Sequence, residues 1–366
     1  MARRRVLDMV QPHLLGLDAY EAVDPPEALA ARAGIPESEV VKLNANENPY
    51  GPSPKVAKAL AEMRRIHLYP DPAQVAAREA VGRYVGLSQE HVVVGNGSDE
   101  IIDLLFRSLL APGEAIVNAV PTFGMYAFSA QVCGGRTLPV ERDARFALNV
   151  KATVDACNRP DVKAVIFASP NNPSGNATAP QDILRLLEAD CLVIVDEAYV
   201  EFDARSVASL VPQHPNLVVL RTLSKWAGLA GLRVGYGLMA PELADVLMRA
   251  KPPYNISQAA ETALLASLAD VDTLNERAGR IIAERARLAG LLAGVPGVNP
   301  LPSEANFILA RMPQGRGKVV YEGLARRGVF VRYYARGVLA DYLRVSVGTP
   351  EQTDRLMAAL AEAMED

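Results

Sequence analysis

The chain contains nine short runs of mainly apolar residues, each with the length and side-chain type of a β-strand. Most of them are apolar at consecutive positions rather than at alternate ones, which is typical of strands covered on both faces of a sheet. The predicted strands cover residues 91–95, 114–120, 163–169, 191–198, 216–222, 233–239, 305–311, 328–334 and 342–348.

Segments with helical periodicity lie between several of these strands. Residues 98–110 and 180–190 begin with polar or acidic side chains and continue with apolar residues spaced along one helix face. Strands that alternate with helices predict an α/β fold, with a mostly parallel mixed sheet covered by helices.

Breaks in this pattern divide the chain into an arm and two domains. Residues 1–41 form an amphipathic lead-in interrupted by prolines, and we predict an N-terminal arm there. Residues 42–250 carry the first six strands and should form the large domain. After Pro252 and Pro253, a long helical stretch over residues 257–292, three strands and a last helix from Pro350 predict a smaller α+β domain over residues 251–366.

Composition and charge narrow the classes of function. Half of the 366 residues are hydrophobic and 22% are charged, as in ordinary globular proteins. A net charge of −4 supplies no basic field for nucleic acid or an anionic membrane surface, and no apolar run is long enough to span a bilayer. We therefore expect small-molecule partners, with no nucleic acid and no membrane.

Cysteine and histidine usage points away from disulfides and metals. Cys133, Cys157 and Cys191 are widely spaced and odd in number, and the four histidines form no paired motif. The basic start of the chain lacks the apolar core and cleavage site of an export signal. These features predict a cytoplasmic protein without a metal site.

Polar residues follow four of the predicted strands directly. They lie at 96–100, 170–175, 196–199 and 222–225. Because ligands of open α/β sheets bind outside the carboxyl ends of the strands, all four segments should face one crevice.

The turn formed by Gly97, Ser98 and Asp99 opens a predicted helix and could bind a phosphate through backbone N–H groups and the helix dipole. An ordinary turn with a helix cap is the simpler interpretation of these residues. A dinucleotide-binding fingerprint is not met, since Gly95-x-Gly97 lacks the third glycine. A Rossmann dehydrogenase is therefore disfavoured.

Asp196 and Lys225 each end an apolar run. A carboxylate in the position of Asp196 is costly unless a positive group pairs with it, although a helix-capping role would also account for it. Lys225 could be a solvated loop lysine, or a lysine that loses its proton easily and forms a Schiff base.

Five motifs together resemble a known family. They are LNANENP at 43–49, SPNNPSG at 169–175, DEAY at 196–199, RTLSK at 221–225 followed by GLR, and LRVSVG at 343–348. In this order they are similar to the fold-type I pyridoxal-phosphate-dependent aminotransferases, and within them to the histidinol-phosphate aminotransferases. The resemblance covers most of the chain. Ser174 stands where the family usually has threonine, which we expect to be neutral.

The resemblance implies a site for pyridoxal 5'-phosphate. Lys225 matches the lysine that holds the cofactor as a Schiff base, and Asp196 matches the acid that pairs with the pyridine nitrogen. Asn172 and Tyr199 match the groups that hydrogen-bond the ring hydroxyl oxygen. Phe123 matches the aromatic residue that stacks on the ring, where many relatives carry tyrosine.

It also implies residues for the cofactor phosphate and for the substrate. The cofactor phosphate would be held by Ser98, Asp99, Thr222, Ser224 and Arg233, with Tyr69 reaching in from a second subunit. On the substrate side, Arg344 matches the arginine that takes the carboxylate or the equivalent region, and Arg332 matches one that binds the substrate phosphate. Tyr20 matches a tyrosine that caps the same phosphate, and Asn46 belongs to the substrate-binding set.

The resemblance implies a transamination that converts histidinol phosphate and 2-oxoglutarate into imidazole-acetol phosphate and glutamate, and the reverse. This reaction belongs to histidine biosynthesis. The resemblance also implies a homodimer with shared active sites. An aromatic amino-acid aminotransferase is the main alternative, and a threonine-phosphate decarboxylase is a more distant one. A binding protein that has kept the fold and lost catalysis is a further alternative. The joint presence of Lys225, Asp196 and Tyr199 argues against that last interpretation.

Overall fold

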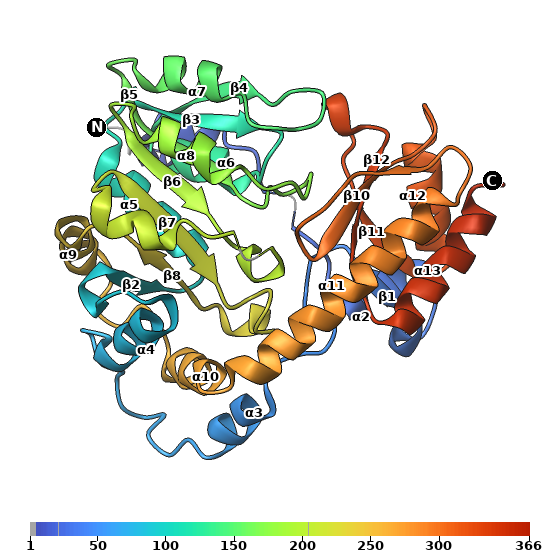
Figure 1. The fold of residues 1–366 in the computed structure, drawn as a ribbon, viewed down its shortest axis with the longest axis horizontal. Coiled ribbons are helices and arrows are strands. Elements are labelled where there is room, and N and C mark those ends of the chain that lie inside the picture. The colour runs from blue at the N-terminus through green and yellow to red at the C-terminus, as the bar shows by residue number, and fades with distance from the viewer. Residues whose placement is uncertain (1–4, 21, 204) are drawn as a thin grey trace.

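A computed structural model describes residues 5–20, 22–203 and 205–366, which fold around two β-sheets (Figure 1). The larger sheet has seven strands in the order β2-β8-β7-β6-β5-β3-β4. Its strands are β2 (Val92–Gly95), β3 (Ala115–Val120), β4 (Arg136–Glu141), β5 (Val162–Ala168), β6 (Leu192–Asp196), β7 (Leu217–Thr222) and β8 (Gly235–Leu238).

Neighbouring strands from β4 to β7 run parallel, whereas β8 is antiparallel to both β7 and β2. The sheet is therefore mixed and mostly parallel, and helices cover it in Figure 1. The predicted fold class is confirmed, and its six predicted strands coincide with strands of this sheet to within two residues at either end.

The helices connect the strands and cover the sheets. They are α1 (Pro12–Leu15), α2 (Pro26–Ala33), α3 (Pro54–Ala61), α4 (Val75–Val85), α5 (Ser98–Leu109), α6 (Met125–Val132), α7 (Val150–Cys157), α8 (Pro180–Leu186), α9 (Pro241–Ala250), α10 (Gln258–Leu268), α11 (Val271–Ala293), α12 (Gly317–Arg326) and α13 (Pro350–Ala363). Short 3-10 helices include η1 (Val6–Met9) and η4 (Val200–Phe202).

The smaller sheet has the order β1-β11-β12-β10-β9. It consists of β1 (Val41–Leu43), β9 (Asn299–Pro300), β10 (Phe307–Arg311), β11 (Val329–Tyr333) and β12 (Tyr342–Ser346). Strand β1 pairs in parallel with β11, so residues 41–43 join the small sheet, although the predicted boundary at 41 and 42 placed most of them in the large domain. A three-residue strand carries too little pattern to reveal such a distant partner.

The predicted single helical stretch over 257–292 is wrong, because two helices, α10 and α11, cover it. The break lies at Ala269 and Asp270. The Asp270 carboxylate accepts a hydrogen bond from Ser53 Oγ and pairs with Lys55 Nζ at 3.2 Å. An aspartate bound to another segment favours a helix boundary over a helix interior.

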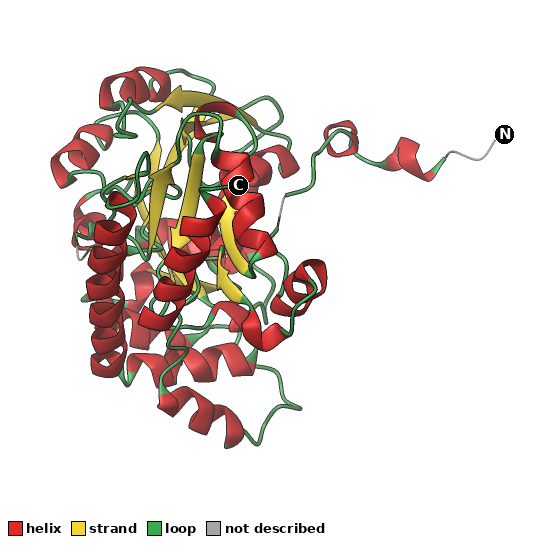
Figure 2. Cartoon of the chain, turned by 90° about the vertical axis from the view of Figure 1, so that its right-hand side faces the viewer, coloured by secondary structure: helices red, strands yellow, loops and turns green. Residues whose placement is uncertain are grey.

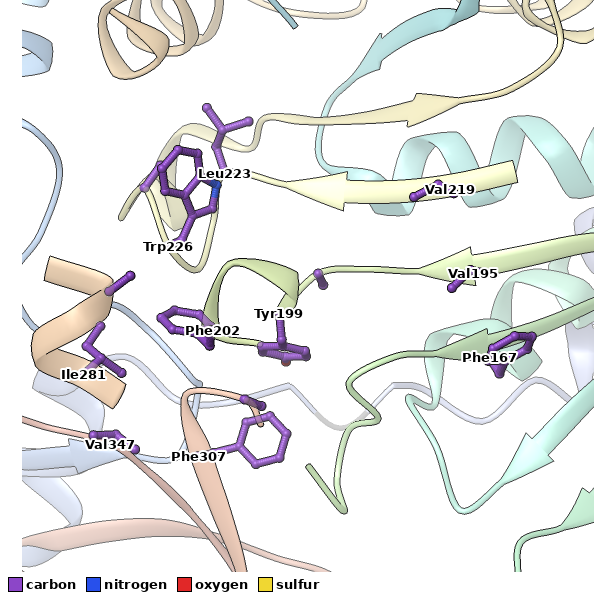
Figure 3. Close-up of a cluster of buried hydrophobic side chains, with 14 of the residues drawn as sticks. Phe167, Val195, Tyr199, Phe202, Val219, Leu223, Trp226, Ile281, Phe307 and Val347 are labelled. Carbon is purple, nitrogen blue, oxygen red and sulfur yellow. The ribbon is translucent and has the colours of Figure 1, made fainter. Parts of the chain in front are cut away.

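Two clusters of buried apolar side chains cover the opposite faces of the large sheet. Val193 and Val195 of β6 belong to the larger cluster, whereas Ile194 between them belongs to the smaller one. Figure 3 shows the larger cluster, in which Val195 and Val219 lie on neighbouring strands and Trp226 lies beside Leu223. Alternation along each strand therefore assigns successive residues to different faces.

The N-terminal segment projects from the rest of the molecule (Figure 2). Several apolar side chains of η1 and α1 are exposed, including Leu7, Met9 and Leu15. Within the described residues, no helix is long and apolar enough to cross a membrane, and no cluster of His, Cys, Asp and Glu side chains could hold a metal ion.

Candidate active site

One cavity of about 220 Å³ lies at the carboxyl ends of the central strands. It gathers most of the residues singled out in the sequence, from the N-terminal segment, from the connections of the large sheet and from the small sheet. These residues are Tyr20, Asn46, Ser98, Asp99, Phe123, Asn172, Asp196, Tyr199, Thr222, Ser224, Lys225, Arg233 and Arg344.

Asp196 ends β6 at the floor of the cavity and is only 4% exposed. Its Oδ2 accepts a hydrogen bond of 2.6 Å from the Tyr126 hydroxyl, and its Oδ1 accepts one of 3.0 Å from the Ala198 N–H. Burial raises the pKa of Asp196 to about 6, because these two donors only partly replace the lost water. A positive group bound beside the carboxylate would stabilise its charged form.

Lys225 follows β7 and extends toward the loop after β1, where its Nζ donates a hydrogen bond of 3.1 Å to the Ala45 carbonyl. Burial, followed by the charge of Arg344, lowers the pKa of Lys225 to about 8. The neutral, and thus nucleophilic, fraction of this amine near neutral pH is therefore larger than that of an ordinary lysine.

A hydrogen-bond network joins the small sheet to the cavity. Arg344 on β12 donates from Nη1 to Asn172 Oδ1 at 2.5 Å and from Nη2 to the Asn44 carbonyl at 2.7 Å. Asn46 Nδ2 donates to the Tyr199 hydroxyl oxygen at 3.0 Å. Burial raises the pKa of Tyr199 to about 12, so the phenol stays protonated. These contacts fix the Arg344 guanidinium at one wall of the cavity.

The opposite end of the cavity is suited to an anion. Helix α5 begins at Ser98 and presents its N-terminal N–H groups, and Thr222 Oγ1 lies 2.9 Å from Ser224 Oγ. Arg233 Nη2 donates to Asp99 Oδ2 at 3.1 Å, which keeps the guanidinium beside the helix start.

Two glycines permit this close packing. Gly97 has φ +79°, and a Cβ there would lie 2.5 Å from Arg233 Nη2. A Cβ on Gly235 would lie 2.4 Å from the Ser98 nitrogen. Only glycine fits at both positions without displacing the anion-binding groups.

Aromatic side chains form another wall. The Phe123 ring packs edge-to-face against Tyr126, with centroids 5.5 Å apart, and against Tyr20 of the arm at 6.2 Å. Burial raises the pKa of Tyr20, while the charges of Arg332 and Arg344 lower it. The arm thus contributes one phenol to the mouth of the cavity.

Two residues singled out in the sequence do not line this cavity. Tyr69 is 78% exposed and stacks on Tyr254 with ring centroids 4.4 Å apart. Arg332 lines an adjoining small cavity with Asn44 and Val23, and its guanidinium lies 5.9 Å from the centre of the Tyr334 ring. Arg332 is the cross-strand partner of Arg344, so both side chains leave the small sheet on the same face.

Comparison with known proteins shows to which family the chain belongs. The model of the family "Aminotransferase class I and II" matches residues 38–360. The chain belongs to the class I and II aminotransferases.

Individual relatives of this aminotransferase share most of its length. It is 44% identical over 365 residues to the histidinol-phosphate aminotransferase of Roseiflexus castenholzii, covering 98% of both chains. It is 45% identical over 355 residues to the chloroplastic histidinol-phosphate aminotransferase 1 of Arabidopsis thaliana, covering 96% of this chain and 85% of that one. The resemblance inferred from the motifs is confirmed.

A solved structure has the same fold. The histidinol-phosphate aminotransferase of Sinorhizobium meliloti, determined in complex with pyridoxal-5'-phosphate, superposes with a TM-score of 0.89 at 27% identity, over 97% of each chain. Family membership and this neighbour together imply pyridoxal phosphate as the cofactor of the aminotransferase.

The residues that line the cavity of the aminotransferase are also chemically suited to pyridoxal phosphate. A protonated pyridine nitrogen would supply the positive partner that the buried Asp196 carboxylate lacks among the described residues. A phosphate would complement the α5 N-terminus and Arg233. Arg344 lines the cavity, and its buried Nε has no hydrogen-bond partner among the described residues.

Sequence reasoning missed Tyr126. This tyrosine is fully buried and contacts Asp196 directly, but it lies three residues after Phe123 inside an apolar helix and was not distinguished from core. The feature of the sequence that could have identified Tyr126 is its hydroxyl group, because the hydroxyl of a buried tyrosine needs a hydrogen-bond partner.

Proposed function

We propose that the protein is a pyridoxal-phosphate-dependent aminotransferase that interconverts histidinol phosphate with 2-oxoglutarate and imidazole-acetol phosphate with glutamate. The observation that carries this proposal is the pair formed by Arg332 and Arg344, which share one face of the small sheet beside Lys225 and Tyr20. The names of the relatives point to the same substrate.

The cofactor would occupy the cavity between the Phe123 ring and the β6 end. Asp196 would pair with the ring nitrogen, Asn172 and Tyr199 would bind the ring hydroxyl oxygen, and Phe123 would stack on the ring. Its phosphate would be bound by Ser98, Asp99, Thr222, Ser224 and Arg233. When bound, the cofactor supplies an electron sink for the charge that develops at the substrate Cα.

The protein residues perform the proton transfers. Lys225 Nζ, with its lowered pKa, accepts the proton from the substrate Cα and later returns a proton as general acid. Asp196 would pair with the protonated ring nitrogen of the cofactor, and Tyr126 holds Asp196 in place through its hydroxyl. The same groups act in reverse on 2-oxoglutarate, so we expect ping-pong kinetics.

Two arginines allow one site to accept both substrates. Asn172 and the Asn44 carbonyl fix Arg344, and it would bind the carboxylate of glutamate or 2-oxoglutarate. Arg332 and Tyr20 would bind the phosphate of histidinol phosphate, and Asn46 supports this side of the site through its bond to Tyr199.

We also propose a homodimer in which Tyr69 completes the site of the partner subunit, and an enzyme that works in the cytoplasm. Tyr69 is outside the cavity of its own chain. Its ring stacks on the exposed Tyr254, and Ile66 and Leu68, close to it in the sequence, are exposed as well. Exposed apolar side chains that gather on a surface are typical of subunit contacts.

The test compares histidinol phosphate, histidine, phenylalanine and tyrosine as donors to 2-oxoglutarate, for the wild type and for Arg332→Ala. Losing charge-assisted hydrogen bonds of about 1.5–3 kcal/mol should reduce kcat/KM for histidinol phosphate on the order of 10- to 100-fold. Activity on phenylalanine should fall less, because phenylalanine has no phosphate.

Arg336→Ala is the matched control. Arg336 is an exposed arginine of the β11–β12 connection that lines a different cavity, so its loss should change neither donor. If Arg332→Ala affects both donors equally, or if the wild type prefers phenylalanine, the aromatic aminotransferase replaces this proposal.

A further inference from the structure

A second set of polar side chains occupies the ends of β6 and β7 on the face opposite the cavity. Asp196 and Thr222 face the cavity, and their neighbours Glu197 and Arg221 face the larger apolar cluster. The register of the two strands puts Asp196 beside Leu220, so Glu197 comes to lie beside Arg221. Figure 3 shows this face, with Val195, Val219 and Trp226 along it.

Glu197 and Arg221 form a buried ion pair that neighbouring hydrogen bonds support. Arg221 Nε donates to Glu197 Oε2 at 3.0 Å, and the two side chains are 9% and 1% exposed, respectively. Ser206 Oγ donates to the same Oε2 at 2.8 Å and accepts from Arg221 Nη2 at 2.6 Å. The Val207 N–H donates to Glu197 Oε1 at 2.7 Å.

Stability alone does not account for such a pair. The cost of removing two charges from water offsets much of their attraction, and apolar residues of similar volume often stabilise a core equally well. What the pair provides is geometry, because the planar guanidinium binds in a fixed orientation. It therefore fixes the separation of two adjacent strand ends.

The same strand ends carry the central residues of the site. Asp196 directly precedes Glu197, and Arg221 begins the turn that leads to Lys225, where Thr222 Oγ1 accepts from the Ser224 N–H at 3.1 Å. Trp226 closes this turn, stacked on Tyr84 with ring centroids 5.4 Å apart and an interplanar angle of 8°. Asn48 Nδ2 also donates to the Trp226 carbonyl at 2.7 Å.

We propose that Glu197 and Arg221 are positioning residues, and that their ion pair holds the Asp196 carboxylate and the Lys225 amine at the separation that the bound cofactor requires. The inference rests on the proposed function in one respect, since it takes Lys225 as the cofactor lysine. Neither side chain touches the cavity, so their effect passes through the two strand ends.

The test uses Glu197→Gln, Arg221→Met and the double variant Glu197→Leu/Arg221→Met. Three quantities are measured: the melting temperature, the dissociation constant for pyridoxal phosphate, and the fluorescence of the cofactor-free protein. Trp226 is the only tryptophan of the chain and adjoins Lys225, so its emission reports on the turn without cofactor. Glu284→Gln is the control, because it breaks the ion pair of the buried Glu284 with the partly exposed Arg287 in α11, away from the cavity.

We expect both single variants to lower the melting temperature, shift the Trp226 emission and weaken cofactor binding at least tenfold. The double variant removes both partners of the pair and leaves Glu201 as the carboxylate that faces position 221, so it should regain only part of the melting temperature but keep the shifted emission and the weak binding. The control should change the melting temperature alone.

A double variant with wild-type emission and wild-type cofactor affinity would overturn the inference, since the pair would then serve stability only. This comparison remains decisive if the single variants do not fold. Failure of the proposed function is a separate result, namely a wild type that binds the cofactor and does not transaminate.

Discussion

At the scale of single residues, Asp196 lowers the stability of the cofactor-free fold while it provides the carboxylate proposed to bind the cofactor. Its pKa of about 6 in the folded chain exceeds the value of about 3.8 expected when unfolded. The folded state therefore binds the proton more tightly, and stability falls as pH rises from about 4 to 6. Above that range the protein without cofactor must carry a buried negative charge.

We predict that Asp196→Asn stabilises the cofactor-free protein above pH 6, by up to about 3 kcal/mol for a shift of roughly two pKa units. The asparagine cannot ionise, so the loss of stability between pH 4 and 6 should also be smaller. Urea unfolding at pH 4, 6 and 8 measures both effects. Asp103→Asn, at an exposed carboxylate of α5, is the control, and equal pH profiles for the two variants would contradict the prediction.

Lys225→Ala should leave the fold intact and remove turnover. General acid–base catalysis by one side chain accelerates a reaction about 10²–10⁴-fold. Because the variant also loses the covalent attachment of the cofactor, kcat should fall by several orders of magnitude. Circular dichroism checks the fold, and steady-state assays with a donor and 2-oxoglutarate check the rate. Substantial steady-state activity in this variant would exclude Lys225 as the cofactor lysine.

At the scale of elements, sequence patterns predicted what local periodicity determines. The continuous apolar runs identified all the central strands, and the polar residues after them identified most of the cavity. The edge strand β4 was missed because its sequence RTLPVE is largely exposed and includes a proline, which suits an edge but weakens the pattern. The break at Asp270 depends on Ser53 and Lys55, more than 200 residues away.

The turn before α5 supports a prediction with a close control. Gly97→Ala introduces a side chain at φ +79° and places its Cβ against Arg233 Nη2, which should displace the guanidinium from the anion site. Gly113→Ala also introduces a side chain at a positive φ, +87°, with open space around the new Cβ.

Both alanine variants should lower the melting temperature, and Gly97→Ala should lower it more, because the contact with Arg233 Nη2 adds to the backbone strain. Only Gly97→Ala should weaken pyridoxal phosphate binding, by roughly 10- to 100-fold if one charge-assisted hydrogen bond is lost. Titration of the cofactor-free proteins distinguishes the two. Equal affinities would show that Arg233 does not bind the phosphate.

At the scale of the whole molecule, the site depends on contacts that no local pattern encodes. Arg344 of the small sheet reaches Asn172 of the large domain, and Tyr20 of the arm packs on Phe123. These residues were expected together only because of the family resemblance. Glu197 and Arg221 lie within the family motifs and Tyr126 lies near Phe123, but their buried partners become visible only in the folded chain.

The position of Tyr69 leads to a prediction about assembly. Its ring is 78% exposed on its own chain and outside the cavity, so its proposed role requires a partner subunit. Tyr69→Ala should weaken cofactor binding, and Lys225→Ala should be inactive, when each is assayed alone at limiting pyridoxal phosphate. Co-expression of the two should restore activity, because each mixed dimer contains one site with both residues intact.

With random pairing, half of the dimers are mixed and one of their two sites is intact, so about a quarter of all sites should regain wild-type affinity and turnover. The measurement is a cofactor titration of activity, compared with that of an equal mixture of the two proteins purified separately and kept from exchanging subunits. Activity no greater than the sum of the separate variants would place Tyr69 in the site of its own chain or outside it altogether. Recovery of the high-affinity fraction requires that Lys225 and Tyr69 of one site come from different subunits, since neither variant alone can supply both.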